Sequence, residues 1–132
     1  MCGCKGKCGC NIISTTKGEK GDASPVASLG YKVYKALISQ SSTNAPTVTV
    51  LQNTIGDIVW TRDGVGVYLG TLANAFTANK TFLPQPSQNN SNKSIVLFRT
   101  GVNVIEIDTF DITNTLADSL LNENSICIEV YP

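Results

Sequence analysis

The 132-residue chain has no histidine, one tryptophan, one methionine and only 15% charged residues. The lack of histidine removes the commonest general base and the commonest nitrogen ligand for metals. Basic and acidic residues balance at 10 each, so the chain lacks the positive charge on which phosphate binding depends. No apolar run approaches the roughly 20 residues of a membrane-spanning helix. These absences argue against an enzyme, a nucleic-acid binder and a membrane protein, and no cofactor is expected.

The length is that of one ordinary domain, but two segments of different composition share it. Residues 1–27, which we call the arm, hold four of the five cysteines and five of the eleven glycines, and no aromatic residue. Residues 28–132 form the body. Six lysines against two acids give residues 1–35 a charge of +4, whereas four basic against eight acidic residues give residues 36–132 a charge of −4. A basic arm on an acidic body indicates either that the two meet different partners or that the arm aids solubility.

Glycine recurs with a period of three in the arm, at positions 3, 6, 9, 18 and 21. A three-chain helix requires this period because only a hydrogen atom fits at its axis. Five interrupted triplets with no proline inside them are too few to hold such a helix alone. The pattern therefore indicates threefold association rather than a stable collagen helix.

Four cysteines of the arm, Cys2, Cys4, Cys8 and Cys10, form a C-x-C-x3-C-x-C pattern. Disulfide or thiol contacts within an assembly are the favoured interpretation, and disulfides would require an oxidising setting. An all-sulfur zinc site comes second, because the spacing departs from the usual C-x2-C pairs. Redox catalysis comes last, since neither a C-x-x-C motif nor a βαβ framework is present.

Short β-prone runs alternate with turn signals throughout the body. The final run shows this best, with Ile126, Ile128 and Val130 alternating with more polar neighbours as a half-buried strand requires. The predicted fold is mainly β, an antiparallel, jelly-roll-like β-sandwich preceded by an extended Gly/Cys-rich arm. The predicted strands are Tyr31–Ser39, Thr47–Gln52, Asp57–Arg62, Val65–Leu72, Ser94–Thr100, Val102–Asp108 and Ser125–Tyr131.

Two local predictions concern the connections between strands. Arg62-Asp63-Gly64 predicts a hairpin turn in which the glycine takes a positive φ. Residues 111–121 predict a short helix, because apolar residues recur every four positions and Asp111 is suited to cap its first turn.

Three groups of side chains are candidate sites, each with a structural alternative. Four acids close in sequence suit a Ca²⁺ site, although capping and solvation are favoured for them because no calcium-loop spacing is present. Two acids near the predicted hairpin suit glycosidase chemistry but are more typical of turns. Four aromatic residues suit a sugar- or protein-binding face, but alternation places most of them in or beside the core. These groups are, in order, Glu106, Asp108, Asp111 and Asp118; Asp57 and Asp63; and Trp60, Tyr31, Tyr34 and Tyr68.

Five stretches between residues 17 and 82 carry a family resemblance. They are Lys17–Asp22, Gly30–Pro46, Val50–Gly56, Trp60–Gly70 and Ala75–Phe82. The first is similar to the collagen-like fragments of phage fibres. The others resemble small virion proteins of phages that infect Bacteroidetes, the crAss-like phages in particular.

The resemblance implies a structural virion protein, such as a capsid-attached head fibre or another appendage. Such fibres are typically parallel homotrimers, with the N-terminus anchored on the particle and a β-rich domain projecting outward. The arm would then contact a capsid protein, and the body would bind a host-surface glycan or carry another fibre protein. The anchoring residues would be Cys2, Cys4, Lys5, Lys7, Cys8, Cys10, Lys17 and Lys20. The alternatives are a carbohydrate-binding module acting off the virion and a zinc protein that uses the four arm cysteines.

Overall fold

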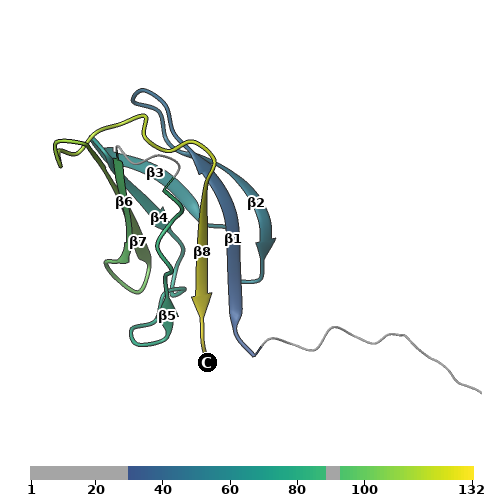
Figure 1. Cartoon of the computed structure of the whole chain (residues 1–132). Coiled ribbons are helices and arrows are strands. Elements are labelled where there is room, and N and C mark those ends of the chain that lie inside the picture. The colour runs from purple at the N-terminus through teal and green to yellow at the C-terminus, as the bar shows by residue number, and fades with distance from the viewer. Residues whose placement is uncertain (1–29, 89–92) are drawn as a thin grey trace, which may run out of the picture.

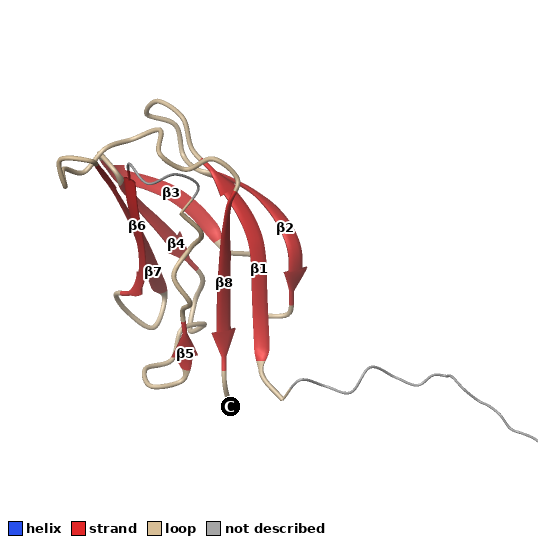
Figure 2. Cartoon of the chain, viewed as in Figure 1, coloured by secondary structure: helices blue, strands red, loops and turns tan. Residues whose placement is uncertain are grey.

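A computed structural model describes residues 30–88 and 93–132 of the chain. Within these ranges all regular structure is strand, and no residue lies in a helix (Figure 2). Accordingly, no helix among the described residues could cross a membrane. The strands are β1 (Lys32–Ser39), β2 (Thr47–Asn53), β3 (Val59–Gly64), β4 (Val67–Thr71), β5 (Thr81–Phe82), β6 (Lys93–Arg99), β7 (Val104–Asp111) and β8 (Asn124–Val130).

The strands form two four-stranded sheets that pack face to face (Figure 1). Sheet 1 has the order β2-β1-β8-β5 and sheet 2 the order β3-β4-β7-β6. All paired strands run antiparallel. The predictions of a mainly β fold and of two packed antiparallel sheets are therefore confirmed. The short strand β5, which pairs with the end of β8, was not predicted.

The core lies between the sheets and follows the two-residue alternation of the strands. In β8, Ile126 and Ile128 are buried, whereas the intervening Cys127 is partly exposed. The largest core side chain, Trp60, packs directly over Gly70 of the neighbouring strand. A Cβ atom at position 70 would lie 2.9 Å from the Trp60 ring. Glycine at this position therefore makes room for the indole. The buried hydrophobic cluster comprises Tyr34, Ala36, Ile38, Ile58, Trp60, Tyr68, Phe76, Ile95, Leu97, Ile105, Ile107, Leu121, Ile126 and Ile128.

The predicted hairpin between β3 and β4 exists, but its turn lies two residues later than expected. Strand β3 continues through a bulge to Gly64, which pairs with Val67. The turn residues are Val65 and Gly66, and Gly66 takes the positive φ of 69°. A Cβ atom on Gly66 would lie 2.6 Å from the Ala117 nitrogen and 2.7 Å from the Thr109 oxygen. The backbone of β7 and of the β7–β8 connection thus leaves no room for a side chain at position 66.

The predicted helix over residues 111–121 is wrong, because this segment is an irregular loop. Asn114 and Ser119 adopt left-handed φ values of 62° and 64°, which interrupt a helix. The apolar residues do not share a buried face, since Ile112 is 73% exposed. Asp111 does act as a cap, but for a turn: its Oδ1 accepts hydrogen bonds from the Thr113 nitrogen and hydroxyl and from the Thr115 nitrogen.

The free edge of β6 is covered by two glutamine side chains from the preceding connection. The Gln85 amide accepts a hydrogen bond from the Leu97 nitrogen at 3.0 Å and donates one to the Leu97 oxygen at 3.1 Å. Gln88 donates to the Ile95 oxygen. An exposed sheet edge has no neighbouring strand to pair with its backbone groups. Along β6, the two glutamine amides bond to some of these groups instead.

The sandwich has two distinct ends (Figure 1). We call the tip the end that carries the β1–β2, β3–β4 and β7–β8 connections. We call the base the opposite end, which carries the β4–β5 and β6–β7 connections. The described chain enters at the base, at Gly30, and ends there at Pro132; both residues line one cavity.

Candidate functional site at the two ends of the sandwich

A polar network at the tip joins three connections around Asp118. The Arg62 guanidinium donates to Asp118 through Nε at 3.1 Å and through Nη2 at 2.7 Å. The Gly66 nitrogen donates to Asp118 Oδ1 at 3.0 Å. The Tyr68 hydroxyl lies 2.9 Å from the same oxygen and 2.8 Å from Gln40 Oε1, and its single proton serves one of these acceptors at a time. One carboxylate thus holds the β7–β8 connection against strands β3 and β4.

Gln40 extends the network to the β1–β2 connection. Its amide nitrogen donates to the Ser42 and Asn44 oxygens, and its Oε1 accepts from the Ser119 nitrogen. Gln40 is buried, and so is the ring of Tyr68. Every connection that the network touches is therefore fixed by contacts within one copy of the chain.

The network also shifts the ionisation of its members. The Arg62 guanidinium, with help from the Gly66 and Tyr68 hydrogen bonds, lowers the pKa of Asp118 to about 2. Burial, together with the contact to Asp118, raises the pKa of Tyr68. Asp118 is therefore ionised and Tyr68 is protonated at neutral pH. The outer surface of the same connections carries exposed apolar side chains, among them Val65 at 53% and Ile112 at 73%.

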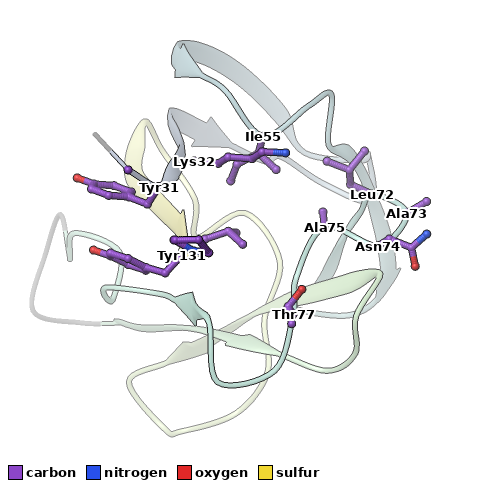
Figure 3. Close-up of a pocket in the computed structure, with 12 residues that line it drawn as sticks. Tyr31, Lys32, Ile55, Leu72, Ala73, Asn74, Ala75, Thr77 and Tyr131 are labelled. Carbon is purple, nitrogen blue, oxygen red and sulfur yellow. The ribbon is translucent and has the colours of Figure 1, made fainter. Parts of the chain in front are cut away.

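The base holds a cavity with a volume of about 580 Å³ (Figure 3). Two tyrosine rings, Tyr31 and Tyr131, stand at its rim with their centroids 4.7 Å apart and their planes 24° apart. The opposite wall is formed by the β4–β5 connection, including Leu72 and Ala75 (Figure 3). Lys32 and Asn74 add polar groups to the lining. The cavity is thus part aromatic, part aliphatic and part polar.

Tyr131 separates this cavity from a second hollow on the same end of the molecule. The second hollow is lined by Asn79, Lys80, Thr81, Phe82 and Tyr131. The Tyr131 nitrogen donates to the Lys80 oxygen at 2.8 Å. Its hydroxyl donates to Glu129 Oε1 at 2.7 Å, and this hydrogen bond raises the pKa of Tyr131 to about 12. The stack on Tyr31 and the hydroxyl bond to Glu129 therefore hold the ring, and the bond to Lys80 holds the backbone beside it.

The predicted aromatic face does not exist as a unit. Trp60, Tyr34 and Tyr68 are buried in the core, as alternation predicted for most of the group. Only Tyr31 lies at an accessible surface, where it pairs with Tyr131. At the base, Tyr31 lies together with the exposed rings of Phe82 and Tyr131. We call these three residues the base aromatic surface.

The four acids considered for calcium are distributed over separate places. Asp111 caps a turn and Asp118 belongs to the tip network, whereas Glu106 and Asp108 lie on the outer face of sheet 2. No group of three His, Cys, Asp or Glu residues suited to a metal occurs in the described part of the chain. Burial raises the pKa of Glu106 and of Asp108, and the nearby charges of Asp108 and Asp63 add to the effect on Glu106.

Asp57 and Asp63 are the two acids considered for glycosidase chemistry. Asp57 lies before β3, and Asp63 lies within it. The arm residues of the predicted anchoring set, Cys2, Cys4, Lys5, Lys7, Cys8, Cys10, Lys17 and Lys20, lie outside the described residues.

The sequence analysis did not identify four residues that shape the two ends as candidate site residues. They are Gln40 and Arg62 at the tip and Phe82 and Tyr131 at the base. Gln40 and Arg62 carried no motif, because their partners are 79 and 56 positions away in the sequence. Tyr131 had a usable signal, since alternation placed it on the outward face of the last strand. Phe82 had none, because a strand of two residues shows no periodicity.

Comparison with known proteins gives no relative for this arrangement: no protein family, curated protein or solved structure matches the chain.

Proposed function

We propose that the protein is a non-enzymatic structural component of a phage virion, a trimeric head fibre or appendage attached to the capsid by its arm. The observation that carries the proposal is the position of the chain ends. The first described residue, Gly30, lies at the base, and the tip with its polar network lies at the opposite end. A body held in this way presents its tip outward from whatever the arm binds.

The sequence supports the same proposal independently. Glycines in a period of three favour association of three chains, and the excess of lysine in the arm suits an acidic capsid surface. Three linked arms raise the effective concentration of each weak contact, so that attachment becomes firm. The resemblance to small phage virion proteins supplies the setting.

The finer fold proposal is a jelly roll. Strand β1 pairs with β8 and β4 pairs with β7, two nested pairings of a hairpin folded back on itself, while β1–β2, β3–β4 and β6–β7 are local hairpins. Successive strands change sheet between β2 and β3, β4 and β5, β5 and β6, and β7 and β8. Nested pairing with frequent crossing between sheets is typical of jelly rolls.

A second candidate function is a carbohydrate-binding module, favoured by the base cavity. A cavity of about 580 Å³ with aromatic rings at its rim and polar groups in its lining suits a small saccharide. This candidate needs no self-association, so the number of copies in solution separates it from the fibre proposal.

Light scattering on the full chain, with and without reductant, tests the proposal. We expect a mass near three times 14.0 kDa. If reductant leaves the trimer intact, the body or the arm glycines hold it; if reductant dissociates it, arm disulfides do. A monomer in both conditions contradicts the self-standing trimer and favours the carbohydrate-binding module.

A further inference from the structure

We propose that the base aromatic surface is where the bodies of neighbouring copies contact one another around their shared axis. This inference rests on the proposed trimer and names the surface that completes it. The occupant is a second copy of this chain. Three observations support the assignment: exposure, position and rigidity.

The first observation is the exposure of large aromatic side chains. Phe82 is 56% exposed and Tyr131 is 42% exposed. They are the only aromatic residues among the large hydrophobic side chains exposed in residues 30–88 and 93–132. Aromatic rings are enriched where proteins meet, because each buries a large area at a small cost in conformational entropy. Both rings border one hollow, so they form a single surface.

The second observation is position. The described part of the body begins at Gly30, three positions after the arm ends in the sequence and one before Tyr31, which stacks on Tyr131. In a bundle of three parallel arms the three Gly30 residues lie close together, and the surfaces next to them are brought together at high effective concentration. The tip is farther away by the length of β1, eight residues or about 26 Å. The exposed apolar residues of the tip, such as Ile112, therefore lie too far from the arms to be gathered by them.

The third observation is that the surface is already ordered in one copy. The Tyr131 ring is stacked on Tyr31, its hydroxyl is bonded to Glu129, and its backbone nitrogen is bonded to Lys80. A rigid surface loses little conformational freedom on association. Each copy also brings charges of both signs to this region, the cations Lys32 and Lys80 and the carboxylate Glu129. Opposite charges of neighbouring copies can therefore pair across the contact.

The test is a double variant of the full chain, Phe82→Ser with Tyr131→Ser, measured by light scattering over a range of concentrations. Reductant is present, so arm disulfides do not hold the copies together. We expect half-dissociation of the trimer at a protein concentration at least tenfold higher than for the natural chain. Ile112→Ser, at the tip, is the matched control and leaves the trimer unchanged. Tyr131→Phe keeps the ring and therefore keeps the trimer.

Thermal unfolding shows that each variant is folded, since all the changed side chains are exposed. If the double variant forms trimers at the same concentrations as the natural chain, the inference is overturned while the trimeric fibre stands. If Ile112→Ser weakens the trimer equally, the base has no special role and the inference is again overturned. A natural chain that is monomeric with and without reductant contradicts both proposals, whereas one that is trimeric only without reductant contradicts this inference alone. If the double variant stays trimeric but loses binding on a glycan array, the surface is a saccharide site instead.

Discussion

At the tip, an ion pair and a buried glutamine bind three connections to one another, and at the base, stacked rings and two hollows stand next to the chain ends. The tip is thus completed by polar contacts within one copy. The base leaves two aromatic side chains uncovered. The difference is therefore one of exposure: the tip connections are held to one another within one copy, whereas the base presents two exposed aromatic rings, which we propose contact a second copy.

This comparison predicts that changes at the tip affect the stability of a single copy, whereas changes at the base affect association.

The largest effect is expected for Gly66→Ala at the turn of the tip. The new methyl group would meet the backbone at Ala117 and Thr109, and the residue would keep a positive φ. We expect a loss of about 3 kcal/mol or more in the free energy of unfolding, measured by denaturant titration. Gly64→Ala is the control, because no atom lies within 4 Å of its added Cβ. Equal costs for the two variants would show that the tip is not tightly packed.

A matched pair of hydroxyl deletions compares the two ends directly. Tyr68→Phe leaves Gln40 or Asp118 without its hydroxyl partner in a buried place. We expect this change to cost about 1–2 kcal/mol of unfolding free energy. Tyr131→Phe removes the exposed bond to Glu129, and we expect no measurable change in stability. The comparison breaks down if the base variant proves the less stable of the two.

The smallest effect concerns pH. The folded-state pKa of Asp118 is about 2, below its ordinary value of 3.8, so its contribution to stability is present above pH 4. This contribution is lost as the pH falls from about 4 toward 2. Glu106 and Asp108 have raised pKa values and act in the opposite direction, favouring the fold as they take up protons.

The difference between the natural chain and Asp118→Asn isolates the tip carboxylate. We expect the advantage of the natural chain to shrink by about 1 kcal/mol between pH 6 and pH 2, because partial exposure screens the ion pair. An advantage that does not depend on pH would mean that the charge of Asp118 adds nothing beyond its hydrogen bonds.

Much of the fold was predictable because strand formation has a local signature. Alternation of apolar and polar residues identified β8 and the direction of its side chains, and the burial of Ile126 and Ile128 confirms it. The expected helix failed for a reason that lies in the tertiary structure. Apolar spacing over residues 111–121 suits a helix, but only a neighbouring surface could have covered Ile112, and the structure provides none within one copy.

Local sequence patterns were enough to locate seven of the eight strands to within about three residues and to orient an alternating strand such as β8. They also marked the basic, glycine-periodic arm. These properties depend on neighbouring residues and on a fixed two-residue repeat. Tertiary structure alone decided that Gly66 rather than Gly64 forms the turn, and that Asp118 meets Arg62 across 56 positions. It also placed Phe82 beside Tyr131 at the end where the arm begins. Such contacts depend on which strands pair across the sandwich, and no local pattern specifies that pairing.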